Sequence, residues 1–454
     1  MTSLDNGGWY ELGVSRRHLL RSGGLLALAG TLGSVLAACG DSSDGGEQTR
    51  SAALGPSPAD LGERITRYVG PIDAKTSGRD LSLKLGALVS LSGPARAFGT
   101  DQVNGAKLAI KHIEAAGGPK FTLIAKDDRS ANPTVGAQIA RELGEEGVQM
   151  ALMANGANGG GSIGPVGQHN ILSIDGGAGI IATTIGKPYI WAGRSTAPDD
   201  GYPAIAQYVA KAMPDAKKIV AVVMEGPAAF TDAYTELIDK AFSNAGAPKP
   251  EIVIGPTFGS TDFSGLVNDL RQDAPDLVVA QMYGTDLGLF IKQFRTSGQQ
   301  TPVIGIDYTA AATEAAGSAL DGYMFAQDTF NPADLASDWA KLYADEYQRM
   351  FKTPAGTFNA NGYEDVFVFW ALVRRVLKAG GDPKSGKDLQ EALIDDPTFP
   401  SLYGGQGDRI GRIRLDAKTH KAVERTMSVS KYEDGKLETL ATCNLDGSNF
   451  QLSA

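Results

Sequence analysis

The strongest constraint on the fold is a regular alternation of short apolar segments with longer segments of helical period. Apolar segments that fit strands begin near residues 83, 120, 148 and 171, and a second series begins near residues 218, 251, 276 and 302. Between the first two strands, apolar side chains recur at Val103, Ala106, Ile110 and Ile113, which is the spacing of one helix face. Repeated strand-helix units form parallel sheets with helices on both faces, so the sequence predicts an α/β fold with two doubly wound lobes.

In doubly wound sheets, ligands bind beyond the carboxyl ends of the strands, in the loops that lead into the helices. The expected strands place six loops there: residues 91–99, 155–162, 175–179, 225–230, 283–286 and 305–308. The pair Asp127 and Asp128 also ends a strand, but adjacent residues on a strand point to opposite faces. We therefore interpret this pair as a turn and helix cap rather than as paired acid catalysts.

Composition excludes several classes of partner. The chain carries a formal charge of −10, and removing residues 1–38, which contribute +1, leaves about −11. Such a charge disfavours nucleic acid and anionic lipid head groups. Only three scattered histidines (His112, His169 and His420) and one cysteine, Cys443, follow residue 39, so we expect no transition-metal site and no cofactor. We expect Cys443 to be a buried structural residue.

Residues 1–38 have the features of an export signal. Arg16 and Arg17 precede an apolar run of about 14 residues, which is too short to span a bilayer. The segment "SRRHLL" resembles the twin-arginine export motif, and "LAAC" resembles a lipobox that would place a lipid on Cys39. We expect residues 39–78 to form a lipidated, flexible tether in which "ADLGERITRYVG" docks as a short helix. A plain secretory signal with a chance cysteine is the alternative.

The glycine-rich stretch "NGANGGGSIG", residues 155–164, fits two catalytic patterns. It contains G-x-G-x-x-G, but it follows the third strand and lacks the acid expected about 20 residues further on. It also contains G-x-S-x-G around Ser162, yet His169 lies too close along the same helix to act as its base, and His420 lies in a charged turn. We interpret the stretch as a ligand-contacting loop with Ser162 as a helix N-cap, and a plain glycine turn remains the alternative.

Several motifs together resemble one family. The segment "LKLGALVSLSGPARAFGTDQVNGAKLAIKHIEAAGG", followed by "DDRSANP", and the later "STDFSGLVNDLRQDAPDLVV" and "NGYEDVFVFWAL" resemble substrate-binding proteins of branched-chain amino acid type ABC transporters. These proteins have the periplasmic binding protein type I fold. The resemblance implies two lobes joined by a three-stranded hinge with crossings near residues 197, 328 and 417. The lobes would then be residues 79–197 plus 328–417, and residues 198–327 plus 418–454.

The same resemblance implies ligand-binding roles for residues of both lobes. In the first lobe they are the loop residue Ser92, the aromatic cover Phe98, and the carboxylate-binding loops with Asn155, Gly156, Asn158, Gly177 and Gly179. In the second lobe, Phe230 and Tyr283 would face the cleft and Asp307 would pair with the ligand's ammonium group. Core packing is the alternative for the three aromatic residues, and a helix cap or hinge salt bridge is the alternative for Asp307. The loops depart from the family pattern because glycines replace the usual hydroxyl residues.

The resulting hypothesis is a non-enzymatic, extracytoplasmic receptor tethered by the lipid on Cys39. It would capture an amino-acid-like, amide or other small polar solute between its lobes and deliver it to ABC permease and ATPase subunits. We expect a monomer that binds no nucleic acid. A secreted serine hydrolase using Ser162 and a ligand-binding sensor not coupled to transport are the alternatives.

Overall fold

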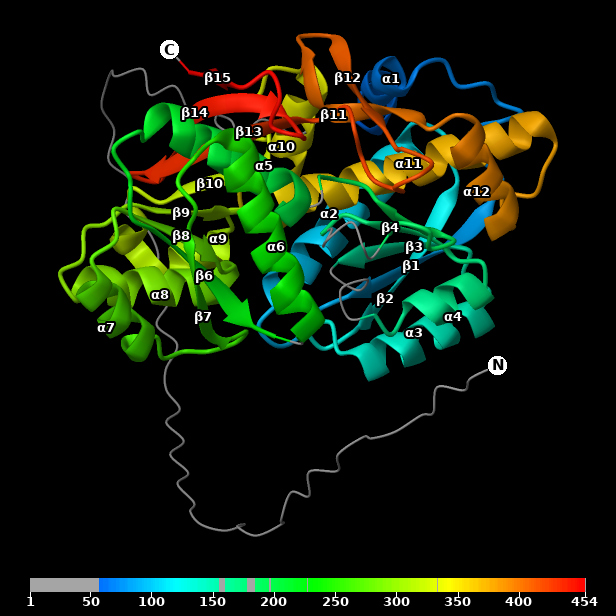
Figure 1. Cartoon of the computed structure of the whole chain (residues 1–454). Helices are drawn as coiled ribbons and strands as arrows, with labels where there is room; N and C mark the ends of the chain where they lie inside the picture. The colour runs from blue at the N-terminus through cyan, green and yellow to red at the C-terminus, as the bar shows by residue number, and fades with distance from the viewer. Residues whose placement is uncertain are drawn as a thin grey trace, which may run out of the picture. The chain divides into compact units, whose positions relative to one another are not determined.

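The computed structural model describes residues 57–154, 160–177, 184–195, 197–226, 228–332 and 334–453. Residues 55–454 form one compact unit. Two separate sheets organise this unit, and we call the parts built on them the first and the second lobe (Figure 1). The α/β fold with two doubly wound lobes is therefore confirmed. The predicted crossing points near residues 197, 328 and 417 stay predictions.

The first lobe contains a five-stranded parallel sheet in the order β2-β1-β3-β4-β5. Its strands are β1 (Ser82–Val89), β2 (Lys120–Asp127), β3 (Met150–Ala154), β4 (Leu172–Asp175) and β5 (Ile190–Ala192). The connecting helices are α2 (Arg96–Ala115), α3 (Pro133–Glu145) and α4 (Ile163–Gln168). The four expected strands are confirmed. The three-residue β5 was not expected, because so short an apolar segment carries little periodic signal.

The second lobe contains an eight-stranded mixed sheet in the order β15-β14-β13-β10-β9-β8-β6-β7. Its parallel strands are β6 (Ile219–Glu225), β7 (Glu251–Thr257), β8 (Leu277–Gln281), β9 (Val303–Ile306) and β10 (Met324–Asp328). The strands β13 (Thr426–Glu433), β14 (Lys436–Asn444) and β15 (Gln451–Leu452) add to it in antiparallel pairs. Its helices are α5 (Ala197–Ala212), α6 (Ala228–Ala245), α7 (Ser264–Asp273), α8 (Gly284–Thr296) and α9 (Ala310–Ala316).

Between β10 and β13 the chain returns to the first lobe. The helices α10 (Asp338–Phe351), α11 (Thr357–Ala379) and α12 (Gly386–Asp395) and the hairpin of β11 (Thr398–Gln406) and β12 (Arg409–Arg414) lie there. The aromatic side chains of α10 and α11 share one core with β1, β3 and β4. In Figure 1 the yellow-orange α11 lies beside the blue α2, although the two helices are far apart in sequence.

The last part of the predicted tether is a helix, α1 (Pro58–Val69), that packs on the first lobe. Pro58 stands at its first position, and the Ser57 hydroxyl caps it by accepting a hydrogen bond from the Asp60 backbone N–H. Leu61, Ile65 and Tyr68 are buried, and the Tyr68 ring stacks on Trp339 at 5.6 Å between centroids. The expectation that this segment docks as a short helix is therefore confirmed.

The close contact between α2 and α11 depends on two glycines. A Cβ at Gly105 would collide with the Asn359 carbonyl oxygen, and a Cβ at Gly362 would collide with the Gln102 carbonyl oxygen. Each helix therefore presents backbone to the other, which leaves no space for side chains at these two positions. This contact fixes α11 against the helix that follows β1, at the strand edge where ligand loops are expected.

Gly105→Ala should lower the free energy of unfolding by about 1–3 kcal/mol, because an added methyl group must push α2 away from α11. Gly167→Ala is the matched control: a Cβ at Gly167, also in a helix, meets nothing within 4 Å. The control should leave stability unchanged or raise it by up to about 1 kcal/mol. Urea unfolding of both variants measures the difference, and equal effects would contradict the packing argument.

Candidate functional site

The two lobes meet at the carboxyl ends of their parallel strands. The Cβ of an alanine at Gly259, after β7, would lie 2.7 Å from Pro94 Cγ of the first lobe. A Cβ at Gly284, where α8 begins, would lie 3.6 Å from the Phe98 ring. Both glycines have positive φ angles of 89° and 54°. Backbone of the second lobe therefore lies directly against the loop and helix that follow β1.

A chain of buried charges connects the segments that pass between the lobes. The Arg194 guanidinium, fully buried two residues after β5, donates to Asp307 at 2.9 Å (Oδ1) and 3.2 Å (Oδ2). Its Nε lies 3.2 Å from Oδ2 of Asp328, the last residue of β10. Arg425, just before β13, pairs with Asp328 at 3.7 Å and with Glu364 of α11. We call these five residues the charge ladder.

Burial by itself lowers the pKa of Arg194, and the Asp307 and Asp328 carboxylates more than offset this effect, so its pKa is raised. The guanidinium therefore stays charged although it is inaccessible to water. The Arg194 guanidinium carbon also lies 5.2 Å from the centroid of the Phe358 ring. A charged group in this position needs both of its acid partners, because an unpaired buried charge is strongly unfavourable.

Asp307, predicted to contact a ligand ammonium, has both carboxylate oxygens engaged by Arg194. A salt bridge, which was the alternative role considered for Asp307, is therefore present between Asp307 and Arg194. Asp307 also has φ = 64°, a conformation that is unfavourable for residues other than glycine and that is concentrated at functional sites. Its contact with a solute stays a prediction. Arg194, Phe358 and Arg425 were missed by the sequence analysis, because their partners are distant in sequence.

Tyrosine hydroxyl groups gather beside Asp307 at the ends of β8 and β9. Tyr283 Oη lies 3.3 Å from Tyr234 Oη, and burial raises the pKa of Tyr283 to about 12. The Tyr323 hydroxyl donates to the Asp307 carbonyl oxygen. Tyr202 is fully buried, and its hydroxyl has no hydrogen-bond partner in the described part of the chain. Tyr283, which was predicted to face the cleft, thus lies in a cluster of tyrosine side chains whose hydroxyl groups gather beside Asp307.

Phe98 forms an aromatic pair with Phe358 of α11. Their ring centroids are 4.8 Å apart at an angle of 77°, and both side chains are buried. Tyr283 packs against the same pair from the second lobe. Phe358 therefore contacts both Phe98, at the start of α2, and Arg194 of the charge ladder.

The remaining predicted site residues divide into two groups. Ser92 and Gly177 are engaged within the first lobe, where their backbone N–H groups donate to Asp127 Oδ1 (3.2 Å) and Asp175 Oδ1 (2.9 Å). Asp127 also accepts from Leu91 and Arg129, which confirms its role in a turn. The others lie outside the described residues: Asn155, Gly156, Asn158, Gly179, Cys39 and the side chain of Phe230.

A cavity of about 570 Å³ lies between the lobes, on the Phe98 side of the aromatic pair. Seven residues between positions 93 and 101 line it from the first lobe, and the second lobe contributes residues of the loop between β7 and α7, of α8 and of α9 with its N-cap Thr309. Two of its carboxyl groups, Asp101 and Asp286, have a pKa raised to about 6, and burial is the main cause for both. This volume is sufficient for a small organic molecule.

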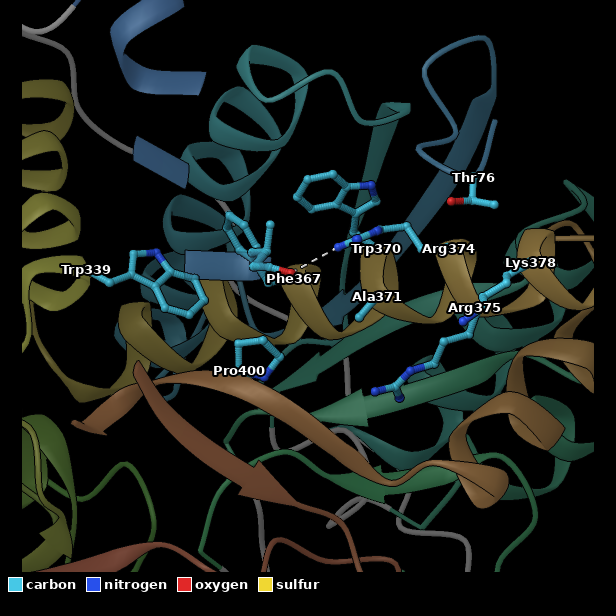
Figure 2. A pocket seen from close by; sticks show the side chains of 10 residues that line it. Thr76, Trp339, Phe367, Trp370, Ala371, Arg374, Arg375, Lys378 and Pro400 are labelled. Atoms are coloured by element: carbon cyan, nitrogen blue, oxygen red, sulfur yellow. Dashed lines mark hydrogen bonds between the residues drawn. The ribbon is translucent and has the colours of Figure 1, made fainter. Parts of the chain in front are cut away.

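A second cavity, of about 220 Å³, lies beside α11 and contains no residue of the second lobe (Figure 2). Its walls include Trp339, Trp370 and Arg374. The Arg374 guanidinium donates to the backbone carbonyl groups of Val69 (3.2 Å) and Pro71 (2.6 Å). Arg374 thereby provides hydrogen-bond donors for carbonyl groups at the carboxyl end of α1, and no charge-ladder residue lines this cavity.

Comparisons with known proteins agree with this architecture. A family model described as periplasmic binding protein matches residues 82–436. The chain belongs to this family. The Leu/Ile/Val-binding protein homolog 3 of Brucella melitensis is 27% identical over 375 residues, which cover 78% of this chain and 92% of the relative.

Among solved structures, the branched-chain amino acid transporter substrate-binding protein LivJ of Streptococcus pneumoniae, in complex with isoleucine, has a TM-score of 0.65 and 23% identity. The alignment covers 79% of this chain and 99% of LivJ. A solute-binding protein from R. palustris in complex with benzoate has a TM-score of 0.69 and 20% identity, over 80% of this chain and 97% of that protein. Both show the type I fold.

As a periplasmic binding protein, the chain is an extracytoplasmic solute-binding protein of the kind that works with ABC transporter permeases. No helix in the described ranges is long and apolar enough to cross a bilayer. Within the same ranges, no group of three His, Cys, Asp or Glu side chains could hold a metal ion.

The serine hydrolase alternative loses its support. Ser162 stands at the N-cap position of α4, but its side chain makes no capping hydrogen bond, so its predicted capping role is wrong. The reason is that its backbone is already helical, with φ −77° and ψ −22°. His169 packs against Gly144, where a Cβ would collide with its ring, and the His420 ring stacks on Trp191 at 4.0 Å. His112 pairs with the Tyr363 hydroxyl at 2.8 Å.

Arg194→Met should lower the free energy of unfolding of this periplasmic binding protein by about 3–5 kcal/mol, because it leaves Asp307 and Asp328 buried without their shared cation. Arg414→Met is the control, since Arg414 pairs with Glu424 at the surface. We expect the control to change stability by less than about 1 kcal/mol. Urea unfolding at pH 7 measures both variants, and a loss below 1 kcal/mol for Arg194→Met would refute the structural importance of the charge ladder.

Proposed function

We propose that this periplasmic binding protein is a non-enzymatic receptor, anchored by a lipid on Cys39, that delivers a small polar organic solute to an ABC importer. The solute class that we propose is an amino acid, an amide or a related polar molecule. One observation carries the proposal: groups from both lobes converge at the strand ends, with Arg194 from the first lobe and Asp307 and Tyr283 from the second.

This arrangement supports capture by closure of the lobes. A solute placed between them contacts both only when they are together, so its binding free energy shifts the equilibrium towards the closed form. The buried aromatic and hydroxyl groups at Tyr283 and Phe98 suit a solute with an apolar or planar body. The relatives named above, a Leu/Ile/Val-binding protein homolog and proteins holding isoleucine or benzoate, support the same size class.

A thermal-shift screen tests the solute class. The panel is L-leucine, L-isoleucine, L-leucinamide, benzoate and benzamide. A ligand at a hundred times its dissociation constant should stabilise the protein by about 2.7 kcal/mol. Tyr283→Ala should abolish the shift, whereas Ser162→Ala should preserve it, with the solute recovered unchanged by mass spectrometry. The absence of a saturable shift with every member of the panel would refute this solute class, and product formation that needs Ser162 would refute the receptor.

Cys39→Ser tests the anchor. If a lipid on Cys39 holds the protein at the membrane, the variant should move from the membrane fraction to the soluble extracytoplasmic fraction of cells expressing the full chain. Cys443→Ser is the matched control: Cys443 is buried, and burial raises the pKa of its thiol to about 12, so it offers no reactive site. Membrane association that persists in Cys39→Ser would rule out this anchor.

A further inference from the structure

The cavity between the lobes is a compartment separate from the charge ladder. Phe98 lines it, Phe358 packs edge-on against Phe98, and Arg194 lies over Phe358. None of the five charge-ladder residues lines the cavity. At the rim, Pro94 and Gly259 bring the two lobes into contact. A group bound here would touch both lobes without reaching Arg194.

The charged residues of this cavity are mostly acidic. Asp101 comes from α2, Asp286 from the first turn of α8 and Glu314 from α9, whereas Arg96 is the single basic residue in the lining. In the parts of the chain that the structure describes, none of these four residues takes part in an ion pair. If all four are ionised, the lining has a net charge of −2.

The acids differ in their surroundings. Asp286 is 3% exposed, and its Oδ2 accepts a hydrogen bond from the Gly259 backbone N–H at 2.6 Å. Burial raises the pKa of Asp101 to about 6, and the nearby side chains of Asn359 and Tyr347 partly offset this effect. Glu314 is exposed to solvent. Hydroxyl groups of Thr100, Thr261 and Thr285 line the same space and can accept further hydrogen bonds.

This distribution of charge contrasts with that around Asp307. Both carboxylate oxygens of Asp307 accept hydrogen bonds from Arg194, so they are already occupied by a cation of the chain itself. The acids of the cavity lack such a cation. A cationic group that enters the cleft therefore gains more at the cavity, where carboxylates in a partly buried setting would make charge-assisted hydrogen bonds.

We propose that the cavity between Phe98, α8 and α9 is a second subsite that binds the ammonium-bearing arm of a solute. The inference rests on the proposed function and deepens it, because it selects amine-bearing solutes from the wider class. The amine of such a solute would reach Asp286, Glu314 and the threonine hydroxyls that line the cavity. Contacts with both lobes would favour closure.

Titration of the full mature chain with 1,4-diaminobutane and 1,4-butanediol at 150 mM NaCl tests this subsite, since the two probes have the same length and differ in charge. We expect the diamine to bind at least about tenfold more tightly, the effect of a charge-assisted hydrogen bond. Glu314→Gln and Asp286→Asn should weaken diamine binding, and Arg96→Gln should strengthen it. Glu236→Gln, an exposed residue of α6 outside the cavity lining, should leave it unchanged.

Equal affinity for the two probes would overturn the proposal, as would diamine binding that none of the three cavity variants alters. Asp286→Asn could disturb the Gly259 loop, so its unfolding midpoint is measured first, and the exposed Glu314→Gln provides the test that does not depend on it. Solutes of the screening panel are titrated alongside. If a panel solute binds and the diamine does not, only the amine subsite fails; if neither binds, the proposed solute class fails with it.

Discussion

The charge ladder is the interaction on which the arrangement of the two lobes depends. Arg194, Asp328 and Arg425 lie near the three crossings that the sequence predicts between the lobes, and Asp307 and Glu364 extend the chain of charges into each lobe. Each buried charge requires its partners, since a buried ion pair that loses one member costs far more than an apolar contact of the same size. The three segments are therefore held in one relative position by electrostatics as well as by packing.

The ladder also decides the chemistry available to a solute. Arg194 pairs with Asp307, the carboxylate that was predicted to bind a ligand's ammonium group. Because Arg194 also lies over the Phe358 ring, it connects the charged and the aromatic parts of the site. Asp365, next to Glu364, is fully buried, and its pKa is raised well above the usual range by burial, with Glu364 adding to the effect. Acid groups without an ion-pair partner among the described residues line the cavity between the lobes instead, at the buried Asp286 and the exposed Glu314.

The repeated strand-helix units of the fold were predictable from the sequence, whereas the very short strand and the antiparallel strands were not. The expected strands of both series and the helices between them are present, because local periodicity reports which face of each element is buried. The strand β5 has three residues, and β13 pairs in antiparallel fashion with β10 from about a hundred residues away, with β14 and β15 added beyond it. Such pairing depends on contacts between distant segments, which local patterns do not encode. The Ser162 cap failed for a similar reason, since its backbone conformation is set by the surrounding loop.

For the site, the sequence identified Tyr283, Phe98 and Asp307 as residues of the strand ends, because every parallel sheet presents its carboxyl-end loops at one edge. Their partners came only from the tertiary structure. Asp307 meets Arg194 from 113 positions away, and Phe98 meets Phe358 of α11, a helix that follows the parallel strands of the second lobe in the sequence. The sequence by itself determined the α/β class, the two lobes and the edge where a ligand binds, since these follow from periodicity and chain order. Which charges are neutralised and which remain available was decided by tertiary structure, because electrostatic pairing depends on distance in space and on burial.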